Sequence, residues 1–417
     1  MILAIVVLVV LLAAVIADNL ADRSILYPPF VFNAIWFMVI LIYVIFKFID
    51  PGEMDTLHPK TLILVGISNI IFSLGGLYVR LQFRKKPSEI KFRPSAIPEI
   101  AGDLIIVLTI ITLVLLWFRA REMASQVWAK NFFIALRHQL TNMRMTYGIL
   151  DYFLVFGLFA SLFRLYLFDN FRDLTFKRRV KLVISVLISF AFLALSTGRT
   201  YIFFYFITVF ITLYLKGKFR SRYVTGFFLT ALLTFVIVGI VLNKGGEFGE
   251  SAGENLKLGL GHILAYFEGP VLALDRFVTS GFDHTFGKNT FRFFIAVLYE
   301  TGLVNTPPVD IVKEWIFVPY PTNVFTVFQP YVMDFGIPGC WVIMFLLGLV
   351  HTWMFYRAKT SDNHFKMLTA YSYFPLLMVF FQDQYFSLLS FWIQLWFYSF
   401  ILLFLFREYS PGKPKIA

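Results

Sequence analysis

Long uninterrupted apolar runs fill most of this 417-residue chain, and they constrain its fold more than any other feature. Each run is close to the roughly 20 residues that a helix needs to cross the hydrocarbon core of a bilayer. A spanning strand would alternate apolar and polar residues, so continuous runs indicate helices rather than a barrel. Hydrophobic residues make up 59% of the chain and charged residues 15%, which excludes a soluble globular domain. We therefore predict an all-α integral membrane protein.

About eleven runs reach the necessary length of roughly 20 residues. They cover residues 1–17, 30–49, 61–82, 99–118, 147–168, 180–197, 200–216, 223–243, 330–356, 366–386 and 388–406. The first run has no basic residue before it, so we interpret it as a span and not as a signal peptide. The chain then divides into an N-terminal transmembrane bundle (1–243), a large polar loop with short amphipathic helices (244–329) and C-terminal helices with a tail (330–417).

Basic residues set the expected orientation of the spans. They gather on alternate connections, at 80–93, 172–181, 216–222, 357–366 and from 407 onward. This pattern predicts an N-terminus outside, a C-terminus inside and a large loop on the outer side, which in a bacterium is the periplasm or the cell exterior. The net charge of +12 is typical of such basic loops and gives no reason to expect nucleic acid. The basic connection 119–146 departs from the pattern, and it suits either an interfacial helix or a surface for anionic lipid head groups.

A tight break between two apolar runs carries an arginine, in the sequence LSTGRT (195–200). We expect Gly198 to adopt a positive φ there and Ser196 or Thr200 to cap a helix. Two interpretations of Arg199 remain open. It either extends to the membrane surface from a helix end, or it is held in a cavity where its guanidinium binds phosphate or carboxylate.

Three acidic residues lie at the ends of predicted spans on the same outer side as Arg199. They are Asp151, Asp334 and Asp383. Ionisable groups at membrane depth are costly and usually have a partner or a function, so these residues predict a polar cavity open to the outside. Arg164 and Asp103 lie toward the inner half, where we expect a structural role.

Motifs for other chemistries are absent from the sequence. It contains no Walker A loop, no Gly-x-Ser-x-Gly elbow and no cluster of His and Cys. Glu53 and Asp55 form an acidic pair that is more typical of a solvated loop than of a metal site. A single cysteine, Cys340, excludes an internal disulfide. We predict neither a metal nor a cofactor.

Four segments, in order, resemble the O-antigen polymerase and ligase superfamily. LSTGRT (195–200) is similar to its Ser/Thr-Gly-Arg hairpin, and AYFEGPVLALDRF (265–277) to the Tyr-x-x-Gly segment of Wzy-type polymerases. FGKNTF (286–291) fits the Gly-centred stretch that follows. PTNVFTVFQPYVMDFGIPG (321–339) resembles the Asn-Val-Tyr/Phe-Thr and Asp-Phe-Gly signature that leads into the next span.

The resemblance implies a GT-C-like, metal-independent glycosyltransferase in the bacterial inner membrane, with its active site facing the periplasm. Such enzymes join oligosaccharide repeat units carried on undecaprenyl pyrophosphate into O-antigen or a related surface polysaccharide. The implied partners are these lipid-linked oligosaccharides and membrane lipids. Whether a chain-length regulator and a flippase of the same pathway also act with the protein is left open.

Chemistry and the resemblance together suggest roles for individual residues. The pyrophosphate leaving group needs cationic donors, and the attacking hydroxyl needs an acceptor for its proton. The expected catalytic residues are His284, His262 and Asp334, the expected pyrophosphate ligands are Arg199, Arg276 and Arg292, with Lys288 ranked after them, and the expected sugar ligands are Tyr320, Asn323 and Tyr266. A solvated helix face is an alternative for Arg276 and Arg292, and interfacial anchoring is an alternative for the aromatic residues.

Two other functions remain open at this stage. A ligase that transfers finished polymer to the lipid A core would use the same chemistry, although the Asp-Phe-Gly signature favours a polymerase. A flippase for lipid-linked sugars would show repeated halves and charges at mid-membrane, and the sequence shows neither.

Overall fold

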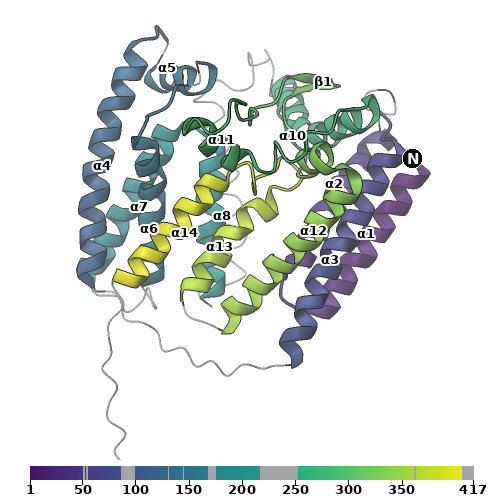
Figure 1. Cartoon of the computed structure of the whole chain (residues 1–417), viewed down its shortest axis with the longest axis horizontal. Coiled ribbons are helices and arrows are strands. Elements are labelled where there is room, and N and C mark those ends of the chain that lie inside the picture. The colour runs from purple at the N-terminus through teal and green to yellow at the C-terminus, as the bar shows by residue number, and fades with distance from the viewer. Residues whose placement is uncertain are drawn as a thin grey trace, which may run out of the picture. The chain divides into compact units, whose positions relative to one another are not determined.

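The computed structural model describes residues 1–49, 52, 55–85, 99–129, 131–143, 145–167, 175–216, 252–360 and 363–405 (Figure 1). Helices dominate these residues. They are α1 (Ile2–Ala21), α2 (Pro28–Ile49), α3 (Pro59–Lys85), α4 (Glu99–Ser125), α5 (Phe132–Arg137), a π-helix (His138–Asn142), α6 (Leu150–Leu167), α7 (Phe176–Ser196), α8 (Arg199–Leu215), α10 (Ala252–Ser280), α11 (Arg292–Glu300), α12 (Phe328–Thr360), α13 (Asn363–Leu377) and α14 (Leu389–Leu405).

Six of these helices are long and apolar enough to cross a membrane, namely α1, α2, α3, α4, α7 and α12. The prediction of an all-α, multi-pass membrane protein is therefore confirmed. A helix occupies every predicted span except 223–243, which lies outside the described residues. Two helices end clearly away from the predicted position. α4 continues to Ser125, past the predicted end at 118, and α13 ends at Leu377, whereas the predicted span continued to 386.

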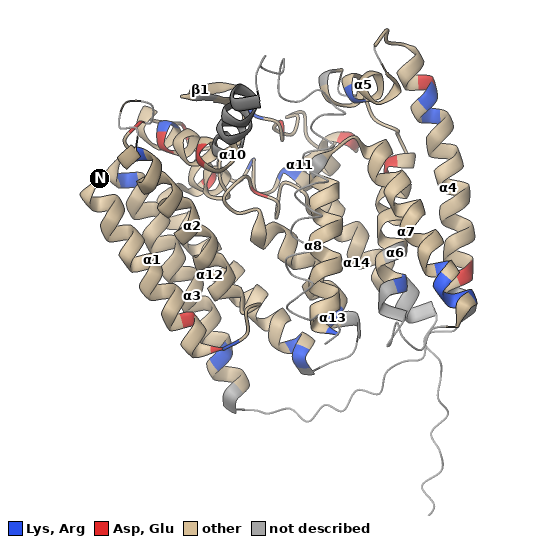
Figure 2. Cartoon of the chain, turned by 180° about the vertical axis from the view of Figure 1, so that it is seen from behind, with Lys and Arg blue, Asp and Glu red and all other residues tan. Residues whose placement is uncertain are grey.

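The chain forms two compact units. The first comprises 1–89, 247–357 and 372–390, and the second comprises 90–246, 358–371 and 391–417. In Figure 2 charged residues are sparse along the helices and gather toward their ends, as expected for apolar segments that end in water.

Glycines bring α3 and α12 into close contact in the first unit. A Cβ atom added at Gly75 would lie 2.3 Å from the carbonyl oxygen of Phe345, and one at Gly348 would lie 2.2 Å from that of Phe72. Phe72 in turn stacks on Phe32 of α2, with ring centroids 4.1 Å apart. Small residues allow membrane helices to pack backbone to backbone, so these glycines set the spacing of the bundle.

An ion-pair network joins three helices of the second unit. Asp103 of α4 accepts hydrogen bonds from Arg164 of α6 at 3.2 Å and from Lys181 of α7 at 2.5 Å. Arg164 is buried, and it also donates to the carbonyl of Gly102. The pairing agrees with the structural role that we expected for Arg164 and Asp103.

The described part of the large loop contains helices and one β-hairpin. Helices were predicted within 244–329, and α10 and α11 are found there. Strand β1 (Ile316–Val318) pairs antiparallel with β2 (Tyr320–Thr322), in a stretch that contains several prolines. The hairpin packs on α10, where a Cβ atom at Gly269 would lie 3.7 Å from Thr322.

Candidate functional site

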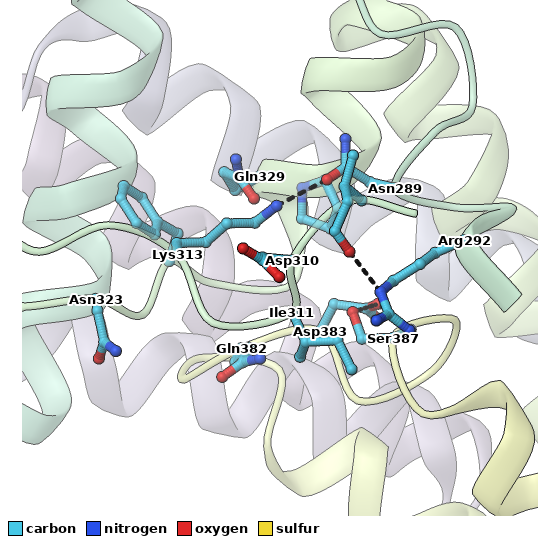
Figure 3. Close-up of a pocket in the computed structure, with 13 residues that line it drawn as sticks. Asn289, Arg292, Asp310, Ile311, Lys313, Asn323, Gln329, Gln382, Asp383 and Ser387 are labelled. Carbon is cyan, nitrogen blue, oxygen red and sulfur yellow. Dashed lines mark hydrogen bonds between the residues drawn. The ribbon is translucent and has the colours of Figure 1, made fainter. Parts of the chain in front are cut away.

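A polar pocket of about 390 Å³, counting the open space at its mouth, lies in the first unit (Figure 3). It is formed by the start of α11, the loop that follows it, the segment between β2 and α12, and the loop after α13. The lining residues are Asn289, Arg292, Val309, Asp310, Ile311, Lys313, Asn323, Phe325, Gln329, Pro330, Gln382, Asp383 and Ser387. Two cations, two carboxyl groups and several amides thus share one cavity.

The two cations are half-buried. Arg292 is the first residue of α11, and its Nε donates to the carbonyl oxygen of Val309 at 2.6 Å. Lys313 donates from Nζ to Asn289 Oδ1 at 2.8 Å. Burial lowers the pKa of both groups, and the nearby carboxylate of Asp310 opposes this shift. Because neither hydrogen bond uses a carboxylate, both cations remain suited to an anionic ligand.

Asp383 organises the loop after α13. Its Oδ1 accepts from the Tyr331 hydroxyl at 2.7 Å and from the Tyr385 amide at 2.9 Å. Its Oδ2 accepts from the amide and the hydroxyl of Ser387, at 2.9 and 2.8 Å. The Val327 amide also donates to the Val379 carbonyl at 2.8 Å, which ties this loop to the segment before α12. These bonds replace those of a helix, and they explain why α13 ends before the predicted position.

Asp334 is buried in α12 and binds the turn formed by residues 285–290. Its carboxylate accepts from the hydroxyl of Thr285, from the amide and the side chain of Asn289, and from the amide and the hydroxyl of Thr290. Two residues later, Gly336 interrupts the helix at φ 70° and ψ −179°, a conformation that essentially only glycine adopts. The Asp-Phe-Gly sequence thus combines an anchor for the turn with a break in α12. Asp334 caps this turn rather than the start of its own helix, which begins at Phe328.

Only some of the predicted site residues line the pocket. Arg292 and Asn323 do so, and Asp334 reaches it through Asn289. His284 is exposed, with Nδ1 3.4 Å from the Met333 carbonyl oxygen, and it is not among the lining residues.

Of four further predicted residues, three belong to α10 and one belongs to the turn of residues 285–290. Arg276 is exposed on α10, and Tyr266 stacks on Phe381 with ring centroids 5.8 Å apart. Lys288 is exposed on the turn that Asp334 anchors. None of these three lines the pocket. His262 belongs to α10, but its side chain lies outside the described residues.

The remaining predictions concern Tyr320 and Arg199, whose side chains are also outside the described residues. Tyr320 belongs to β2, and Arg199 begins α8 in the second unit. The predicted backbone of the arginine hairpin is corrected. Thr197 adopts the left-handed conformation at φ 49°, whereas Gly198 has φ −98°. Glycine is favoured at 198 by space, because a Cβ atom there would lie 3.3 Å from the Tyr201 ring.

The second unit places Asp151 near this hairpin. The Tyr147 hydroxyl donates to the Leu195 carbonyl at 2.7 Å, which joins the segment before α6 to the end of α7. Asp151 follows in the first turn of α6. Of the four polar residues expected at the outer face, Asp334 and Asp383 therefore belong to the first unit, and Asp151 and Arg199 belong to the second.

Sequence reasoning missed several pocket residues, above all Lys313, Asn289 and Gln329. Lys313 lies in a loop with no regular periodicity, so nothing local distinguishes it from a solvated lysine. Asn289 lies within the FGKNTF segment, which could have directed attention to it. Among the residues that the structure describes, no group of three His, Cys, Asp or Glu side chains is placed to hold a metal ion.

Comparisons with known proteins do not identify a function, so the function is inferred from the chemistry of the site. The chain matches no protein-family model, no curated protein and no solved structure.

Proposed function

We propose that this protein polymerises oligosaccharide repeat units carried on undecaprenyl pyrophosphate, by metal-independent glycosyl transfer. The observation that carries the proposal is the pocket in which Arg292 and Lys313 lie beside the amide groups of Asn323, Gln329 and Gln382. Two half-buried cations suit a pyrophosphate, and amides suit sugar hydroxyls.

Segments named by the sequence resemblance supply much of this pocket. Asn289 and Arg292 belong to FGKNTF or follow it directly, and Asn323, Phe325 and Gln329 belong to the segment 321–339. Two of the four segments that prompted the resemblance thus meet at the pocket, which supports a shared role for these two.

The proposed reaction breaks the bond between the anomeric carbon of the growing glycan and its pyrophosphate oxygen. A hydroxyl of the incoming repeat unit forms a new bond to that carbon and gives up its proton. Negative charge develops on the departing undecaprenyl pyrophosphate, where the cations stabilise it. His284, His262 and Asp334 remain predictions for the catalytic group. The five donors around Asp334 make it the least suited to accept a proton, since its oxygens are already occupied.

The proposal includes the finer topology. It places about eleven helices in the bacterial inner membrane and residues 244–329 on the periplasmic side, following the distribution of basic residues. A polyprenyl chain can then remain in the bilayer while its head group enters the pocket.

Reconstitution of the purified protein with lipid-pyrophosphate-linked oligosaccharides tests the proposal. We expect a ladder of products that survives EDTA. Arg292→Ala, which removes one cation of the pocket, should abolish it, and Arg292→Lys should restore little, because an ammonium lacks the planar fork of a guanidinium. Movement of the lipid across vesicles without a ladder would instead favour a flippase, and transfer of polymer to lipid A core would favour a ligase.

A further inference from the structure

One side-chain amide connects a buried carboxylate to a cation of the pocket. Asn289 donates from Nδ2 to Asp334 Oδ1 at 2.9 Å, and its Oδ1 accepts from Lys313 Nζ at 2.8 Å. The amide is thereby held at both ends, with its negative end toward the ammonium group and its positive end toward the carboxylate. Such chains of hydrogen bonds polarise and strengthen one another in a medium of low dielectric constant.

The far end of this chain is rigid. Asp334 is buried, and the Thr290 amide and hydroxyl both donate to its Oδ2 at 2.7 Å. The Thr285 amide donates to the Met333 carbonyl at 3.1 Å, so the turn is tied to α12 by its backbone as well. Asn289 is also buried, and its Nδ2 has a second acceptor, the Thr285 hydroxyl, at 3.0 Å. The amide therefore cannot rotate without breaking several bonds.

Lys313 otherwise lies in a loop without regular structure, and a lysine side chain has four flexible carbons. The charged groups that act on it are Asp334 from α12, Arg292 from α11, Asp310 from its own loop and Asp383 from the loop after α13. Of these, Asp334 is linked to Lys313 through a single intervening side chain.

We propose that Asp334 is a positioning residue, which acts through Asn289 to hold the Lys313 ammonium at the pocket, where it binds a phosphate or pyrophosphate group. The inference rests on the proposed function for the identity of this anion. It gives Asp334 a role different from the catalytic one expected from the sequence, and it makes Lys313 a ligand-binding residue that the sequence did not reveal.

The arrangement implies a specific dependence of anion binding on pH. Burial lowers the pKa of Lys313, while Asp334, Asp310 and Asp383 raise it against this effect and Arg292 lowers it further. Affinity is therefore present at low pH and lost as the pH rises through the pKa of Lys313. Removing the Asn289 side-chain amide makes the charged Lys313 ammonium less stable and lowers its pKa further. The loss of anion affinity should therefore begin at lower pH in Asn289→Ala than in wild type.

Binding of inorganic pyrophosphate to the detergent-purified full-length protein tests the inference, by isothermal titration calorimetry from pH 6 to 10. We expect Lys313→Met to weaken binding about tenfold or more, and Asn289→Ala about three- to tenfold. Thr290→Val is the matched control, because it removes one donor to Asp334 and leaves the link through Asn289 intact. It should lower the melting temperature yet change the affinity less than about twofold.

A double-mutant cycle separates positioning from general damage to the fold. Asp334→Asn should weaken pyrophosphate binding in the wild-type background and cause no further loss in the Lys313→Met background. Equal losses in both backgrounds would overturn the inference, as would wild-type protein that does not bind pyrophosphate. If Asp334→Asn does not fold, an Asn289→Ala affinity equal to that of wild type or of Thr290→Val overturns it instead.

The experiments distinguish failure of the positioning role from failure of the proposed polymerase function. Protein that binds pyrophosphate in the expected pattern but makes no polymer would retain the positioning role and lose the polymerase. A product ladder that is unaffected by Lys313→Met and Asn289→Ala, with unchanged pyrophosphate affinity, would retain the polymerase and lose the positioning role.

Discussion

Two regions of the first unit each bury a carboxyl group, the turn around Asp334 and the middle of α10 around Glu268. They differ in the hydrogen-bond donors that they provide for it. Asp334 is 1% exposed and accepts hydrogen bonds from three residues. Glu268 is 0% exposed, and neither of its oxygens has a hydrogen-bond donor among the described residues. Donors favour the ionised form of a carboxyl group, and burial without donors favours the neutral form.

The comparison shows that burial alone does not define the role of an acidic residue. Asp334 holds a turn and connects to a cation. Glu268 lies where α10 meets its neighbours, next to Gly269, which packs on the β-hairpin, and Phe267, which stacks on Phe380 with centroids 4.9 Å apart. Burial raises the pKa of Glu268 to about 8.

The largest expected loss of stability comes from removing the better-satisfied carboxylate. Asp334→Ala leaves the amides of Asn289 and Thr290 without their buried acceptor, at a cost of about 3 kcal/mol or more. We expect a large fall in melting temperature and a loss of monodisperse protein on size-exclusion chromatography. A melting temperature within a few degrees of wild type would show that the turn does not depend on Asp334.

Glu268→Gln should change the dependence of stability on pH. The ordinary pKa is 4.5, so between this value and about 8 the unfolded chain releases a proton that the folded chain retains. Stability should therefore fall as the pH rises, by about 1.4 kcal/mol per pH unit in this window. We expect thermal unfolding of Glu268→Gln to match wild type near pH 5 and to occur at a higher temperature than wild type near pH 8.

Parallel curves for wild type and Glu268→Gln would contradict this account and would mean that the carboxyl group is ionised and has a partner. Asp275→Asn is the matched control on the same helix, because the Asp275 carboxylate is half-buried and accepts from the His58 amide at 2.7 Å. It should not flatten the pH dependence.

A smaller effect is expected at another buried acid, Asp383. Tyr331→Phe removes one of its four donors, at a cost of about 2 kcal/mol because the acceptor is charged. Tyr385→Phe is the matched control. It removes a hydroxyl that lies 2.9 Å from His351 Nε2, and it keeps the hydrogen bond from the backbone amide of residue 385 to Asp383. Thermal unfolding should show about half the loss for Tyr385→Phe. Equal losses would indicate that Asp383 gains little from Tyr331.

The sequence by itself determined the class of fold. Apolar runs of membrane length predict helices wherever they occur, because a backbone in lipid must satisfy its own hydrogen bonds. Local reasoning also gave Arg164 and Asp103 a structural role, in agreement with their ion pair, and it predicted a polar cavity near Asp334 and Asp383. Reaction chemistry and the family resemblance together selected Arg292 and Asn323, which line the pocket.

Only the tertiary structure decided how these residues are used. The loop of Asp383 ends α13 through bonds to Tyr331, a residue distant in sequence, and the anchor at Asp334 depends on a turn that lies 44 to 49 residues earlier. Lys313 becomes part of the site because Asn289 accepts its hydrogen bond, and no periodicity marks that contact. Periodicity reports which face of an element is buried, whereas the partners of a buried polar group are set by segments that meet only after folding.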